Sequence, residues 1–405
     1  MENTSSRKFW TLRYTLLNAT YFVAFCAIHA FALNFLLAHG FTNTQVGILL
    51  AVANITSAFV QPWIAGIIDK RGWLTNRRFI LISVLSIAAG ALALLFVPEV
   101  RVFIFVVYAL IYMIQFAYQP IMLAICFEYQ RAGCRINFGL SRGLGSASFA
   151  VTAFFIGSAV ERNGVSVLLI VSVIALLISA VVIYTFRKPE TGENGGTQTG
   201  DAQEEAAKGH SNLLDFARTY PVFMLFLAAT VCLFFAHNMI NDFMIQIIRS
   251  LGGTETHHGY ASFMQAILEL PVMALIGYVY KKISANKLLI VSGTAFLIKI
   301  LVLVFSVHLA GMFISQSFQL FAYAVFVPAS AFYVTTTMDE YDQVKGQAFV
   351  TSAITIGGVF SNLISGVIMD MLGVKSMLIA GSIVCALGTL IIWIAMLGRR
   401  SNRSA

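Results

Sequence analysis

Long apolar stretches alternate with short polar segments along the whole chain. Runs of about 20 residues or more, each long enough to cross a bilayer as a helix, cover residues 10–37, 45–68, 78–97, 101–126, 139–160, 165–186, 219–248, 257–280, 287–307, 309–336, 346–370 and 375–398. We therefore expect an all-α membrane protein with twelve transmembrane helices. A closed barrel would instead show short segments of alternating polarity, about ten residues each.

The composition supports a membrane protein. Of the 405 residues, 59% are hydrophobic and 11% are charged, against about 25% charged residues in soluble domains. The mean hydropathy is +0.83. The first apolar run is too long for the core of a signal peptide and lacks a small-residue cleavage pattern, so we expect it to remain as the first span.

Lysine and arginine are distributed unevenly between the two sides of the predicted bundle. With the N-terminus inside, the outer loops contain only Arg101, Arg162, Arg249 and Lys375, and the inner segments contain most of the others. By the positive-inside rule, both termini should lie in the cytoplasm, with the chain in the cell (inner or plasma) membrane. The net charge of +8 then follows from topology, and no nucleic-acid partner is expected.

One polar segment is long enough to separate two domains. Residues 188–213 are rich in Gly, Thr, Glu and Gln and contain little that could be buried, as in a flexible cytoplasmic linker. We expect an N-terminal six-helix bundle at 1–187 and a C-terminal six-helix bundle at 214–405. The five cysteines form no C-x-x-C pair and are expected to be packing residues.

The two halves resemble each other in sequence. Gly47 lies 22 residues before Asp69-Lys70, and Gly259 lies 22 residues before Lys281-Lys282. Such matches indicate two pseudo-symmetric repeats, with binding expected at the repeat interface near the middle of the membrane.

The loop after the second run carries a cluster of charges and glycines: Gly66, Asp69, Lys70, Gly72, Arg77 and Arg78. This pattern resembles the loop signature of the major facilitator superfamily. The resemblance implies the major facilitator fold and a cytoplasmic gate, with Glu128 as the acidic partner of the loop arginines. An ordinary solvated charge patch is the alternative for Arg77 and Arg78.

The fifth run begins with the segment 137–149, Asn-Phe-Gly-Leu-Ser-Arg-Gly-Leu-Gly-Ser-Ala-Ser-Phe. It resembles the oligosaccharide:proton symporter (lactose permease-like) family. The resemblance implies that Arg142 binds sugar hydroxyls, that Phe149 stacks on the sugar, and that Gly145-Ser146 packs nearby. The family has Trp at the position of Phe149, and its fourth-span Glu falls at Leu123 or Ala124.

The second half departs further from that family. Lys299 stands in place of its ninth-span Arg, and the residues that replace its other ionisable groups are His237, Ala266, Gln316, Gln319 and Ala322. The proton machinery of the family therefore cannot be transferred, and any proton coupling must use different groups.

Ionisable residues inside spans are costly and are functional candidates. His237, Glu269 and Lys299 lie near the centres of their runs, and Asp242 lies nearer an outer end. We expect Glu269, Lys299 and Asp242 to serve proton coupling. A permanent structural ion pair between Glu269 and Lys299 is the alternative.

Uncharged polar residues in the second half are candidates for substrate binding. His237-Asn238 could bind substrate hydroxyls or relay protons, and Gln316 and Gln319, three residues apart, share a helical face. Hydrogen bonding between helices would produce the same pattern.

These observations favour a secondary active transporter that imports a small polar solute, such as a sugar or glycoside, together with a proton by alternating access. The alternatives are a nucleoside or organic-acid transporter, a proton-coupled efflux antiporter and a non-transporting membrane sensor. An enzyme is not expected, because the sequence has no nucleotide loop, metal-spaced His/Glu set or nucleophile elbow. We expect a monomer without cofactor or metal, whose partners are a small-molecule substrate, protons and the lipid bilayer.

Overall fold

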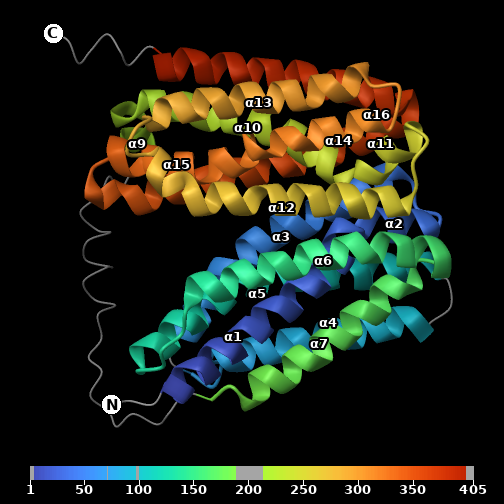
Figure 1. The fold of residues 1–405 in the computed structure, drawn as a ribbon, viewed down its shortest axis with the longest axis vertical. Coiled ribbons are helices and arrows are strands. Elements are labelled where there is room, and N and C mark those ends of the chain that lie inside the picture. Colours follow the sequence, from blue (N-terminus) through green and yellow to red (C-terminus); the bar gives the residue numbers. More distant parts are fainter. Residues whose placement is uncertain (1–3, 71, 97–99, 188–212, 398–405) are drawn as a thin grey trace. The chain divides into compact units, whose positions relative to one another are not determined.

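The computed structural model describes residues 4–70, 72–96, 100–187 and 213–397, and every regular element within them is helical. In the first half the helices are α1 (Thr4–Phe25), the π-helix η1 (Cys26–Ala30), α2 (Ala32–Ala38), α3 (Asn43–Asp69), α4 (Asn76–Phe96), α5 (Arg101–Arg131), α6 (Phe138–Asn163) and α7 (Ser166–Thr185) (Figure 1).

The second half is equally helical. It consists of α9 (Leu213–Thr219), α10 (Pro221–Asp242), α11 (Met244–Ser250), α12 (Glu255–Val279), α13 (Ala285–Phe305), α14 (Ala310–Ser317), the 3-10 helix η2 (Phe318–Leu320), α15 (Tyr323–Thr337) and α16 (Glu340–Leu397). The predicted linker, 188–213, lies outside the described residues except for Leu213, where α9 begins.

The predicted apolar runs are helical in the structure. In the part of the chain that the structure describes, however, fewer than twelve helices are both long and apolar enough to count as membrane spans. Nine helices of the described residues are long and apolar enough to cross a bilayer, or ten if the bent pair Phe9–Ala30 and Ala32–Ala38 is one span. The 58-residue α16 counts once there, although Gly373 interrupts it with a φ of 80°. This break separates the runs predicted at 346–370 and 375–398. The total of twelve spans stays a prediction.

The described chain forms two compact units. Unit 1 comprises Met1–Gly192 and Gly253–Ile267, and unit 2 comprises Glu193–Gly252 and Leu268–Ala405. Helix α12 therefore contributes its first part to unit 1 and its second part to unit 2.

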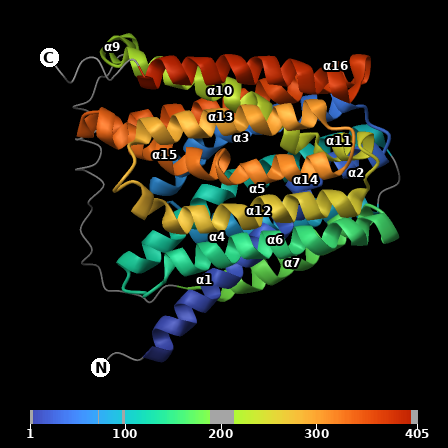
Figure 2. The ribbon, with the colours of Figure 1, turned by 45° about the horizontal axis from the view of Figure 1, so that its top comes forward.

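Within unit 1, α1 packs along α6 and α7 (Figure 2). Polar contacts fix the register of α1 and α6, because the Thr11 hydroxyl accepts a hydrogen bond from Asn137 N at 3.1 Å and the Thr15 and Ser141 hydroxyls are 2.8 Å apart. Asn137 also caps α6, its side chain accepting a hydrogen bond from Leu140 N. These contacts hold the segment that carries Arg142 against α1.

The first part of α12 packs closely on α6 within unit 1. A Cβ added to Gly157 of α6 would lie 3.0 Å from the Cα of Gly259. At the end of α6, the Glu161 carboxylate accepts a hydrogen bond from Thr256 N at 3.2 Å. Glycine at both positions lets the two backbones meet, as small residues do in membrane helix pairs.

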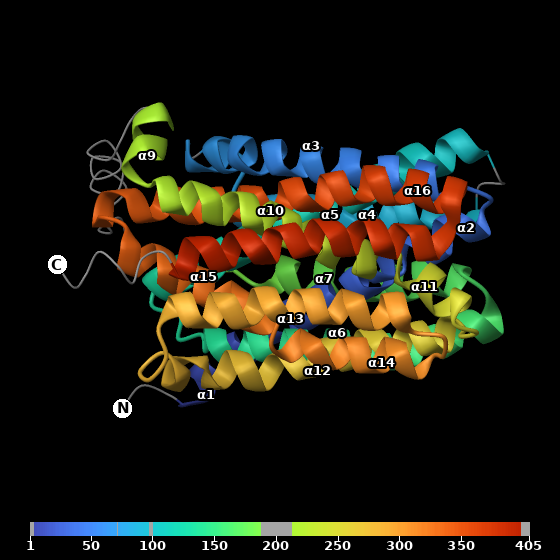
Figure 3. The same cartoon turned by 90° about the horizontal axis from the view of Figure 1, so that it is seen from above.

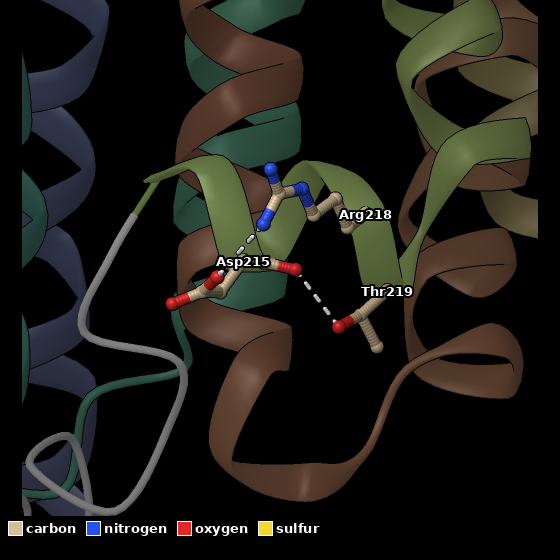
Figure 4. Close-up of polar contacts among 3 residues, drawn as sticks. All are labelled: Asp215, Arg218 and Thr219. Atoms are coloured by element: carbon tan, nitrogen blue, oxygen red, sulfur yellow. Dashed lines mark hydrogen bonds and ion pairs between the residues drawn. The ribbon is translucent and has the colours of Figure 1, made fainter.

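Within unit 2, α10 lies beside α16, and α13 packs against α15 and α16 (Figure 3). The short helix α9 leads into this unit. Its Asp215 and Arg218 form an exposed ion pair at 4.0 Å, and the Thr219 hydroxyl donates to the Asp215 carbonyl at 2.8 Å (Figure 4). The anchor of α9 is Phe216, which is fully buried against Tyr220, Phe223 and Phe349.

Candidate functional site

Three of the predicted residues form a hydrogen-bonded chain inside unit 2. The Lys299 ammonium donates to the amide oxygen of Gln319 at 2.6 Å, and the amide nitrogen of Gln319 donates to the Glu269 carboxylate at 2.8 Å. Lys299 and Gln319 are both 0% exposed. We call these three residues the charge chain. A residue predicted to bind substrate thus links two residues predicted to couple protons.

A break in the helix places Gln319 within this chain. The segment α14–η2–α15 tightens to a 3-10 turn at Phe318–Leu320 and resumes at Tyr323. Helix α13 stabilises this segment on either side of the break, because Ser315 Oγ donates to the Lys299 carbonyl at 2.8 Å and Ser292 Oγ donates to the Ala322 carbonyl at 2.7 Å. Irregular backbone at membrane depth is tolerated where protein groups satisfy it in this way.

His237 and Asn238 do not act as a pair in the structure. The buried His237 ring stacks on Tyr323 with centroids 5.1 Å apart, and its Nε2 lies 2.9 Å from the Asn241 amide nitrogen. Asn238 faces α16, where its Nδ2 would lie 2.8 Å from a Cβ added to Gly358. Neighbouring positions on a helix point about 100° apart, which accounts for the divergence.

The other two predicted residues of unit 2 are Gln316, which is fully buried, and Asp242, which is partly exposed. Gln316 is 0% exposed, and neither of its amide atoms has a hydrogen-bond partner among the described residues. Asp242 ends α10 and lies next to Asn362 of α16. A buried unpaired amide is costly and is a candidate for contact with a ligand or water.

In unit 1, Arg142 lies at the contact between α6 and α1. Its guanidinium donates to the Ser146 hydroxyl at 2.6 Å and stands over the ring of Phe22, 4.4 Å from the centroid. Phe149, one turn beyond Ser146, packs against Phe25 with centroids 6.3 Å apart. The three residues singled out on the fifth run therefore share one face of α6 with the aromatic residues of α1.

His29, which was not among the predicted site residues, lies between aromatic residues of α1 and α5. His29 belongs to the π-helix η1, and its ring lies 4.3 Å from Phe25, 3.7 Å from Tyr112 and 4.3 Å from Phe116. We call these four residues the His29 cluster. A histidine in an apolar run was the available signal, whereas a π-helix, frequent at functional sites, leaves no pattern in the sequence.

The predicted gate residues gather at one end of unit 1. The Glu128 carboxylate accepts a hydrogen bond from Asn76, which begins α4 directly before Arg77. Arg77 donates to the Tyr184 carbonyl at 2.9 Å, and Arg78 donates to the Trp73 carbonyl at 2.5 Å. Arg77 therefore binds the end of α7, and Arg78 binds the loop that precedes α4.

The remaining gate residues lie in the loop itself. Asp69 is the last residue of α3, and Lys70 is its C-cap. Gly66 and Gly72 have open space where a Cβ would be. Arg71 lies outside the described residues, and the gate as a whole stays a prediction.

The sequence matches a known family over most of its length, because residues 13–380 match the MFS_1-like family. The chain belongs to the major facilitator superfamily. Among curated proteins no sequence match was found. Membership makes the chain a multi-pass membrane protein and a secondary transporter of a small molecule, in a family of transporters rather than enzymes.

Solved structures of other superfamily members share the fold. The chain is similar to a mutant form of the nucleoside transporter NupG, with a TM-score of 0.76 and 14% identity over 96% of this chain and 99% of that one. An auto-inhibited POT family peptide transporter gives a TM-score of 0.73 at 11% identity, over 98% of each chain. At such low identity these matches establish the fold alone.

A third similar structure is neither a nucleoside transporter nor a peptide transporter by its name. A bacterial homologue of the human lysosomal transporter Spinster, in an inward-facing and unoccupied conformation, gives a TM-score of 0.71 at 12% identity, covering 100% of this chain and 99% of that one. The three relatives differ in the cargo that their names indicate. The lactose permease-like subfamily therefore stays a prediction.

Proposed function

We propose that this superfamily member is a proton-coupled importer of a small neutral polar solute of the sugar or glycoside class. The observation that carries the proposal is the charge chain, in which a buried ammonium and a carboxylate are joined through a single amide at a helix break. Ionisable groups are costly inside a membrane span, so a linked pair there is a candidate for coupling.

Protonation of Glu269 would change the charge chain directly. The ionised carboxylate accepts a hydrogen bond from Gln319 and compensates the charge of Lys299. A protonated carboxyl loses that charge and becomes a donor as well as an acceptor. The segments that hold the chain, α12, α13 and η2, would then differ in relative stability between the two protonation states, which is what a coupling ion needs in order to shift a conformational equilibrium.

The substrate groups of this proposal lie in unit 1. The Arg142 guanidinium is a planar fork of N–H donors, suited to adjacent hydroxyls of a sugar. Phe149 and Phe25 lie close by and offer ring faces to the apolar side of a sugar ring. Gly145 lets α6 approach Phe22 of α1 closely, because a Cβ at this position would lie 2.9 Å from the Phe22 ring.

A nucleoside is the second candidate, and the His29 cluster favours it. Three aromatic rings surround His29 within 4.3 Å between centroids, and planar heterocycles stack well on such surfaces. Arg142 would then bind ribose hydroxyls. Arg142 and Phe149 would dominate the affinity for a sugar, whereas the His29 cluster would dominate the affinity for a nucleoside.

Uptake into proteoliposomes tests the proposal. The purified chain is reconstituted and offered radiolabelled sugars, glycosides, nucleosides and organic acids, each with and without an imposed inward proton gradient. We expect accumulation of a sugar or glycoside only with the gradient. Accumulation of nucleosides alone would establish the second candidate, and uptake unaffected by the gradient would refute proton coupling.

A further inference from the structure

Helices α10 and α16 of unit 2 meet through two consecutive glycines. A Cβ added to Gly357 would lie 3.0 Å from Phe235 N, and one added to Gly358 would lie 2.8 Å from the Asn238 side chain. This close approach leaves little freedom to slide, and it aligns the two helices so that the turn after Asn238 meets the turn after Gly358.

Polar side chains occupy those next turns. Asp242, four residues after Asn238, lies within side-chain hydrogen-bonding distance of Asn362, four residues after Gly358. Ser361 and Ser365 flank Asn362 on the same side of α16, since Ser361 lies one turn after Gly357 and Ser365 follows Asn362 by three residues.

Three buried oxygen atoms of this group have no hydrogen-bond partner among the described residues. Asn362, Ser361 and Ser365 are each 0% exposed. The amide oxygen of Asn362 and both serine hydroxyls make no hydrogen bond with the described residues. Side chains that merely join two helices would bond to each other or to the helix backbone. Three buried unsatisfied oxygen atoms beside a carboxylate therefore indicate a ligand that accepts their lone pairs.

We infer that Asp242, Asn362, Ser361 and Ser365 form a binding site for a monovalent metal cation, and for Na⁺ in particular. All four side chains supply oxygen, the donor that hard cations prefer. The single carboxylate balances one positive charge, whereas a divalent ion would bring a second charge into a buried place. The side chain of Asp242 is half-buried.

This inference goes beyond the proposed function and does not depend on it. The charge chain uses Glu269, Lys299 and Gln319, none of which belongs to the cation site. A chain with both sites would respond to sodium and to protons through separate groups.

Equilibrium binding of ²²Na⁺ to the purified full-length chain in detergent tests the inference directly. We expect saturable binding that unlabelled Na⁺ displaces. Asp242→Asn should weaken it by about 100-fold, and Asn362→Leu and Ser365→Ala each by about 10-fold, in line with the sensitivity of metal sites to loss of supporting groups.

Two controls make the result interpretable. Glu340→Gln removes an exposed carboxylate at the start of α16, outside the site, and Ser382→Ala removes a partly exposed hydroxyl from α16 beyond the break at Gly373; both should keep the wild-type affinity. Ser365→Ala, a small change, remains informative if Asp242→Asn fails to fold. Absence of saturable ²²Na⁺ binding would overturn the inference, because the site would then take up protons at most. Unchanged affinity in folded Asp242→Asn would also overturn it.

Discussion

The ammonium of Lys299 and the amide oxygen of Gln319 are 2.6 Å apart in the interior of unit 2. The other end of the same amide donates to Glu269. An amide has one accepting and one donating end, so Gln319 fits a cation on its oxygen and an anion on its nitrogen. Its orientation therefore depends on the charge of both neighbours.

Gln319→Leu is expected to lower the stability of the chain. The substitution leaves a fully buried ammonium without its acceptor, and breaking a buried charge network typically costs about 3 kcal/mol or more. Gln316→Leu is the matched control, because the amide of Gln316 has no hydrogen-bond partner among the described residues and its removal should be neutral or stabilising. Thermal unfolding of both purified variants measures the difference, and equal unfolding temperatures would contradict the bridging role.

Glu269→Gln should separate transport from coupling. The neutral amide still accepts a hydrogen bond from Gln319 but cannot bind and release a proton. We expect exchange of substrate between the two sides of a proteoliposome to continue, while accumulation driven by a proton gradient is lost. Counterflow and gradient-driven uptake, measured on the same preparation, test this. Proton-driven accumulation at the wild-type level in Glu269→Gln would remove this carboxylate from the coupling mechanism.

The sequence predicted the class of fold, and it singled out several residues that the structure brings together, for identifiable reasons. Apolar runs and the charged loop indicated the superfamily, which the family match confirmed over 13–380. Glu269, Lys299 and Gln319 were recognisable because a polar residue in a span is conspicuous. Their connection was not, because it depends on the 3-10 turn at Phe318–Leu320. The same limit applies to His29, whose aromatic neighbours on α5 are distant in sequence.

Arg142→Ala is expected to weaken substrate binding by about 10- to 100-fold, the range for losing charge-assisted hydrogen bonds. Arg142→Lys keeps the charge but not the planar fork, so it should recover only part of the affinity. Ser146→Ala removes the hydroxyl that accepts from Arg142 and should have a smaller effect, by loosening the guanidinium. Binding of the substrate identified by the uptake panel, followed by calorimetry, tests the order. Unchanged affinity in Arg142→Ala would remove the sugar-family analogy.

Gly157→Ala should destabilise the chain through the contact between α6 and α12. The added methyl group would meet the Gly259 backbone at 3.0 Å, and backbone cannot move aside as a flexible side chain can. Overpacking of this kind typically costs about 1–3 kcal/mol.

Gly143→Ala is the control for this substitution, because it lies on the same helix with nothing within 4 Å of the added Cβ. It should be neutral, or stabilising by up to about 1 kcal/mol through helix propensity. Unfolding temperatures of the two variants should therefore move in opposite directions or differ by several degrees. If both rise together, the glycine pair is not a close backbone contact and the packing of α12 on α6 is looser than the structure shows.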